Sequence, residues 1–204
     1  MGDGSPDASI LPLLFDLLNE CVDTSDSSQS PITKPAAVDS TCAEPILGTI
    51  WSVTMSYADG TRSRNQQPEV KTEAQSTNNE GHDDKWMLDG SHAATLCSLV
   101  HACADAATPL ALPDSMVLSI VGAVGNLAHH PPSRAALLRA SEPEFEDGEG
   151  EGERPEPKLR HALVTIAGGE EGAQQAVAGT YASELRRLAL RAAAGISSIA
   201  PTSN

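Results

Sequence analysis

The stretch VLSIVGAVGNLAHHPPSRAALLRA, residues 117–140, decides the fold that this sequence predicts. Its first half carries apolar residues at the spacing of one face of an α-helix. Asp114 stands before this helix, the His-His-Pro-Pro run at residues 129–132 ends it, and residues 133–140 predict a second, short helix. The apolar face of the first helix consists of Val117, Leu118, Ile120, Val121, Val124, Leu127 and Ala128.

The same helical period recurs on both sides of this stretch. Apolar residues at intervals of three and four predict further helices at residues 10–22, 46–57, 96–107, 159–167 and 185–199. Pro45 suits the first turn of the second helix, Asp59-Gly60 its end, and Ser91 the N-cap of the third. The predicted buried face of the first helix is Ile10, Leu13, Leu14, Leu17, Leu18 and Cys21, with Leu11, Phe15 and Val22 beside it.

Composition agrees with an all-α fold. Aromatic residues make up only 3% of the chain, while Ala, Leu, Ile and Val dominate the apolar set. Closely packed helices use such residues more readily than sheets do, because strands favour aromatic and β-branched side chains. Three segments, residues 23–40, 58–90 and 141–157, are nearly free of aliphatic residues, and we interpret them as disordered insertions.

The charge of the chain limits its partners. The formal net charge of -15 argues against nucleic acid and anionic membranes, which both attract basic surfaces. No stretch has the apolar length of a membrane span, and Asp3 and Asp7 stand where a secretory signal would be basic. We therefore expect an intracellular protein of the cytoplasm or the nucleus, without a small-molecule substrate.

Residues 117–140 resemble the long third helix of an armadillo repeat, with its Asn-Leu-Ala ending, loop and following Leu-rich turn. A weaker repeat is visible because AVGNLA at residues 123–128 and GISSIA at residues 195–200 each end a helix that follows an apolar one. The resemblance implies an armadillo-like right-handed α-solenoid of about three helix pairs, and HEAT repeats stay an alternative. Along the chain it implies a first helix pair at residues 1–57 with a flexible insertion at 23–40, a polar linker at 58–90, a repeat at 91–140, an acidic insertion at 141–157 and a second repeat at 158–200.

The resemblance singles out one binding residue, Asn126. In peptide-binding armadillo proteins the Asn of the third helix bonds to the backbone of an extended ligand, so Asn126 would contact a peptide. The family's companion Trp, one turn earlier, is replaced by Gly122, and Ser198 stands at the Asn position of the last helix. A regular ladder of Asn and Trp is therefore not predicted, and the alternative role of Asn126 is a bond to a neighbouring helix or turn.

Residues that could carry chemistry are few. Cys97 and His101 share one helix face at i, i+4, but two ligands do not make a metal site, and no orienting group or oxyanion-hole motif accompanies them. Cys21, Cys42, Cys97 and Cys103 have no CxxC or zinc-ribbon spacing, so we interpret them as reduced thiols. We expect no enzymatic activity, no cofactor and no metal.

The sequence therefore predicts a non-catalytic scaffold that binds other proteins through stacked helices. The first helix is apolar over a wide arc, as expected for a segment or reduced relative of a longer solenoid protein, whose helix pairs leave apolar faces until others stack on them. The alternative is a regulatory or helical-tail segment of a larger enzyme, such as a Fused-type protein kinase.

Overall fold

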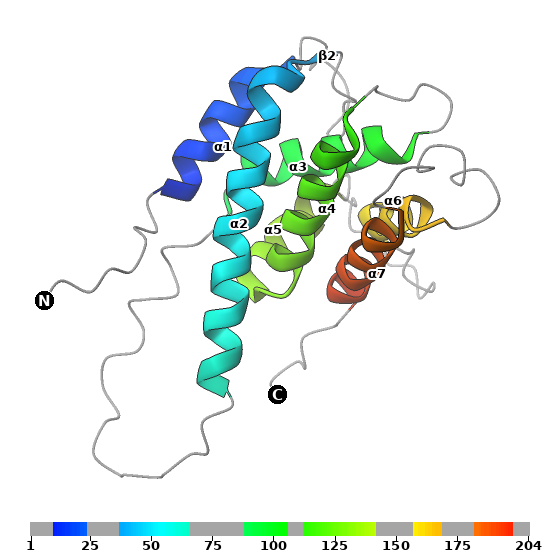
Figure 1. The fold of residues 1–204 in the computed structure, drawn as a ribbon. Helices are drawn as coiled ribbons and strands as arrows, with labels where there is room; N and C mark the ends of the chain where they lie inside the picture. The colour runs from blue at the N-terminus through cyan, green and yellow to red at the C-terminus, as the bar shows by residue number, and fades with distance from the viewer. Residues whose placement is uncertain are drawn as a thin grey trace, which may run out of the picture.

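The all-α class is confirmed. The computed structural model describes residues 10–23, 37–65, 88–105, 112–141, 157–168 and 182–197, and these are helical apart from one pair of two-residue strands and short connections (Figure 1). The elements are α1 (Ile10–Cys21), β1 (Val22–Asp23), β2 (Ala37–Val38), α2 (Ser40–Asn65), α3 (Gly90–Ala104), α4 (Asp114–Ala128), α5 (Pro131–Ser141), α6 (Lys158–Ile166) and α7 (Ala182–Ser197).

The ends of α4 and α6 follow the signals in the sequence, whereas those of α2 and α3 do not. Helix α4 begins at Asp114 and ends before the His-His-Pro-Pro run, and α6 ends at a turn in which Gly168 has φ 95°. Three signals were wrong. Pro45 does not lie in the first turn of α2, because the helix begins at Ser40, where the Asp39 carboxylate accepts a hydrogen bond from the Thr41 N–H. The N-cap of α3 is Asp89, whose side chain accepts a hydrogen bond from the His92 N–H, and not Ser91. Helix α2 continues through Asp59-Gly60, since a single helical Gly costs only about 1 kcal/mol, which a helix of 26 residues can absorb.

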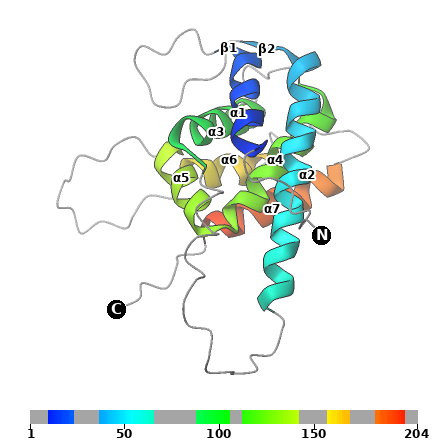
Figure 2. The same ribbon diagram turned by 90° about the vertical axis from the view of Figure 1, so that its left-hand side faces the viewer.

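The helices form two rows. In one row α4 lies between α2 and α7 and contacts both, and in the other α3 contacts α1 and α6. The rows are joined where α1 packs on α2, where α6 packs on α7, and where α3 meets α4, while α5 covers α3. The C-terminal part of α2 extends beyond the other helices in both views (Figure 1, Figure 2).

Helix α4 lies at the centre of the core. From Leu118 to Ala128 every residue is buried, including the polar Ser119 and Asn126. The predicted burial of Leu118, Val121 and Leu127 is confirmed, as is that of Leu96, Leu99 and Val100 on α3. A helix buried on all sides must be surrounded by others, which explains why α4 contacts both of its row neighbours as well as α3 and α5.

The buried face of α1 differs from the predicted one. Leu11, Phe15, Leu18 and Cys21 face the core, whereas Ile10, Leu13 and Leu17 are 43%, 60% and 48% exposed. The reason is that α1 is apolar around most of its circumference, so the helical period fits more than one face, and the contacts with α2 and α3 select among them. No helix in the described ranges combines the length and the apolar character that a membrane crossing needs.

Candidate functional site

Asn126, the residue predicted to bind a peptide, lies between α4 and α2. It is 7% exposed, and its Nδ2 donates a hydrogen bond of 3.3 Å to Thr54 Oγ1. Thr54 is itself 3% exposed and donates its hydroxyl proton to the Trp51 carbonyl oxygen at 2.9 Å. The threonine oxygen thus accepts from Asn126 and donates to its own helix, so both side chains are bonded in the interface. The ligand role of Asn126 stays a prediction.

One turn before Asn126, an aromatic residue from α2 packs against the backbone of α4. The indole of Trp51 lies against the backbone of Gly122, so closely that a Cβ added at Gly122 would overlap its ring. Sequence reasoning missed Trp51, because nothing in the local pattern pairs it with a glycine 71 positions later.

Three apolar side chains form an exposed stripe on the outer side of α1. Ile10, Leu13 and Leu17 are spaced at i, i+3 and i+7, which places them along one face of the helix. The acidic residues Asp16 and Glu20 lie next to this stripe, and both are exposed. We call Ile10, Leu13 and Leu17 with these two acids the outer face of α1.

The inner side of α1 is fastened to α3 by specific contacts, and one further contact reaches Asp16 at the edge of the outer face. Phe15 stacks on the buried imidazole of His92, with ring centroids 5.1 Å apart. His92 Nε2 lies 3.1 Å from Asp16 Oδ1, and the Thr95 hydroxyl donates a 2.6 Å hydrogen bond to Asn19 Oδ1. These contacts fix the rotation of α1, so the outer face is held toward solvent by the packing of the inner one.

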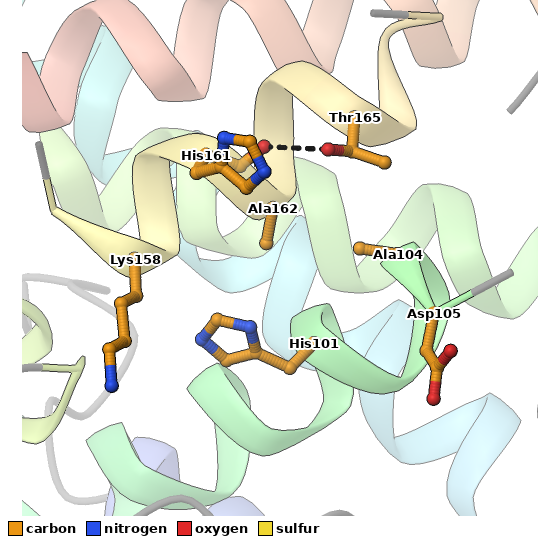
Figure 3. Close-up of a pocket in the computed structure, with 7 residues that line it drawn as sticks. All are labelled: His101, Ala104, Asp105, Lys158, His161, Ala162 and Thr165. Atoms are coloured by element: carbon orange, nitrogen blue, oxygen red, sulfur yellow. Dashed lines mark hydrogen bonds between the residues drawn. The ribbon is translucent and has the colours of Figure 1, made fainter. Parts of the chain in front are cut away.

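An open pocket of about 550 Å³ lies between the end of α3 and α6 (Figure 3). Its lining residues are His101, Ala104, Asp105, Lys158, His161, Ala162 and Thr165. Within the described part of the chain, His101 Nε2 is a buried nitrogen without a hydrogen-bond partner. Burial, together with the nearby Lys158 and His161, lowers the pKa of His101 below its ordinary value of 6.5, so its imidazole is neutral at pH 7.

Neither Thr165 in the pocket nor the nearby Cys97 is placed as a nucleophile. The Thr165 hydroxyl donates to the His161 carbonyl oxygen at 3.0 Å and is thus directed at its own helix (Figure 3). Cys97, the candidate nucleophile or metal ligand beside His101, is buried, its Sγ lies 3.6 Å from the Leu137 carbonyl oxygen, and burial raises its pKa to about 12. A thiol of that kind is a poor nucleophile at neutral pH. Among the described residues, no three His, Cys, Asp or Glu side chains are placed to hold a metal ion.

Comparisons of this chain with protein-family models, with curated proteins and with solved structures gave no match.

Proposed function

We propose that this chain is a non-catalytic scaffold that binds other proteins, and that the outer face of α1 is its binding surface. The observation that carries the proposal is the exposed stripe of Ile10, Leu13 and Leu17. Single exposed apolar residues are common on soluble proteins, but three that line up on one helix face and are rimmed by polar residues are typical of a protein contact. The packing of α1 on α3 keeps this stripe in water.

The proposal includes an armadillo-like array. It is supported by the row of α2, α4 and α7 and by the second row of α1, α3 and α6, because stacked helix pairs produce two such layers. In an array of this kind each pair presents an apolar face to the next one. The outer face of α1 is then the surface on which another helix would stack.

The chemistry of this face indicates the kind of partner. The stripe is flanked by the carboxylate of Glu20 and by that of Asp16, which also contacts His92 of α3, and α1 has no basic residue. The occupant that matches both features is an amphipathic helix of another protein, with an apolar stripe and Lys or Arg beside it. The net charge of -15 would also speed the encounter with a basic partner.

The test compares capture of partners by four forms of the full chain, which are the unchanged chain and three variants. Leu13 and Leu17 are each about half exposed, so covering them contributes roughly 1 kcal/mol apiece. Their joint replacement in Leu13→Glu/Leu17→Glu should weaken binding by about thirtyfold or more. Leu190→Glu is the matched control, because Leu190 on α7 is 48% exposed, as is Leu17. Glu20→Lys should weaken the same partners, and added salt should do so as well.

Two outcomes would contradict the proposal. One is that the Leu13→Glu/Leu17→Glu variant captures the same partners as strongly as the unchanged chain does. The other is a partner lost equally in the Leu190→Glu control, since that would trace the effect to general surface polarity. Circular dichroism and melting of each variant show whether the helices are intact, so that a loss of binding is assigned to the surface.

A further inference from the structure

Two cysteines from different helices meet at the junction of α1 and α2. Cys21 is the last residue of α1 and is buried, while Cys42 lies in the first turn of α2 and is exposed. The Sγ atoms are 2.6 Å apart, and both thiols are free. The spacing of 21 residues matches no sequence motif, so the pairing emerges only in the folded chain.

The backbone around the two cysteines holds them in place. Strands β1 and β2 pair Val22 with Val38, and the Asp39 N–H donates a 2.9 Å hydrogen bond to the Cys21 carbonyl oxygen. Asp39 also begins α2, because its carboxylate accepts from the Thr41 N–H at 3.0 Å. The pairing of β1 with β2 therefore brings the end of α1 next to the start of α2, with Cys42 directed at Cys21.

The other two cysteines lack these properties. Cys97 and Cys103 both lie on α3, and the Cys97 Sγ lies 3.6 Å from the Leu137 carbonyl oxygen and not beside a thiol from another helix. Of the four cysteines, Cys42 alone is exposed. An oxidant in solution would therefore reach Cys42 first, and the thiol beside it is Cys21.

From this geometry we infer that Cys21 and Cys42 form a reversible redox site that closes to an intramolecular disulfide when the chain meets a small disulfide such as oxidised glutathione. The Cys42 thiolate attacks one sulfur of the small disulfide, forms a mixed disulfide and expels the first glutathione thiolate. Cys21 sulfur then attacks Cys42 sulfur and expels the second. The protons from the two cysteine thiols end on the two glutathione thiolates, so two thiols are oxidised and one small disulfide is reduced.

The bond would fasten the base of α1 to the first turn of α2. A cross-link that closes a loop of about 20 residues lowers the unfolding equilibrium constant by roughly a hundredfold through the entropy of the unfolded chain. The site is independent of the proposed binding function, because it concerns the thiols and their local geometry and not the outer face of α1.

The experiment equilibrates the full chain in mixtures of reduced and oxidised glutathione, stops the exchange with acid and blocks free thiols with an alkylating reagent. Cleavage before aspartate separates the two cysteines, because Asp23, Asp26 and Asp39 lie between them. Mass spectrometry should then find one linked pair, containing Cys21 and Cys42, that disappears on reduction. Cys103→Ser should leave this pair unchanged, whereas Cys21→Ser should stop the reaction at a glutathione adduct on Cys42.

Urea unfolding gives the second readout. The oxidised chain should unfold with an equilibrium constant about a hundredfold below that of the reduced chain, and Cys42→Ser, an exposed and therefore mild substitution, should abolish this difference. The inference is overturned if the unchanged chain itself stops at the Cys42 adduct. It is also overturned if the linked peptides join Cys42 to Cys97 or Cys103, or join two copies of the chain.

Discussion

We predict that four glycine-to-alanine substitutions will differ in the sign of their effect on the free energy of unfolding. The reason is that a Cβ at Gly122 would overlap Trp51, whereas the other three glycines have more room. Alanine is favoured over glycine in a helix by about 1 kcal/mol, so each substitution begins with the same gain. At Gly48 on α2 nothing lies within 4 Å of the new Cβ, and Gly48→Ala should raise the free energy of unfolding by about that amount. At Gly125 on α4 the nearest atom is Ala192 Cβ at 3.6 Å, an ordinary contact, so Gly125→Ala should also stabilise.

At Gly122 the new methyl group would overlap the Trp51 indole, and Trp51 or α2 would have to move. Overpacking of this kind costs about 1 to 3 kcal/mol, which cancels or exceeds the helix gain. Gly122→Ala should therefore be less stable than Gly125→Ala by about 1 to 3 kcal/mol. Gly195→Ala should fall between them, since its Cβ would lie 3.0 Å from Ala128 Cβ. All four glycines lie in helices, so the gain in helix propensity is the same for each substitution. The differences in the free energy of unfolding among the four variants therefore measure the packing around each new methyl group.

The assay is urea unfolding followed by circular dichroism, with the double variant Trp51→Leu/Gly122→Ala completing a mutant cycle. Relief of the overlap should make the two substitutions less damaging together than the sum of their separate effects. The reasoning is refuted if Gly122→Ala stabilises as much as Gly48→Ala does, because α2 would then not pack on α4 at Trp51. It is also refuted if the cycle is additive, since additivity would mean that the two residues do not touch.

Three further predictions concern single side chains. Asn126→Ala should lower the free energy of unfolding by about 1 to 3 kcal/mol, measured in urea, because it removes the donor to Thr54 from a buried interface; weaker partner capture with unchanged stability would instead support the ligand role. His101 has a folded pKa below 6.5, so the unfolded chain binds the proton more readily; stability should fall as pH drops below about 7, and His101→Gln should reduce this fall. In the mixed disulfide, burial and the carboxylates of Asp39 and Glu20 still hold the pKa of Cys21 above its ordinary value, so closure, followed by alkylation and mass spectrometry, should accelerate about tenfold per pH unit between pH 7 and 8.

Helix positions could be predicted because each helix carries its own period and its own end signals. Helix α4 shows this most clearly, since Asp114 and the run of His and Pro bound an apolar stretch that has to be buried. The N-cap of α3 was harder, because Asp89 and Ser91 are both suited to it and stand two positions apart. Only the fold decides which of the two side chains meets a free N–H.

Contacts between helices could not be predicted in the same way. The partners Asn126 and Thr54 are 72 residues apart, and neither has a sequence feature that points to the other. The contact between Cys21 and Cys42 could not be predicted either, because it depends on the pairing of β1 with β2. These strands have two residues each, which is too short for an alternating pattern to be visible in the sequence. The sequence therefore predicts which segments are helical. Which side chains contact each other depends on how the two rows of helices pack together.

Helix α1 brings these findings together, because it is fixed at two places along its length by different kinds of contact. Near the middle of the helix, Phe15 stacks on His92 and sets the rotation that exposes Leu13 and Leu17. At its C-terminal end, Cys21 lies against Cys42 and sets its distance from α2. A helix held at both places has little freedom to turn its apolar stripe inward, although burial of that stripe would be favourable. The exposure of the stripe therefore follows from the packing of the inner side, and this is why the outer face of α1, more than the buried Asn126, is the surface on which we expect a partner to bind.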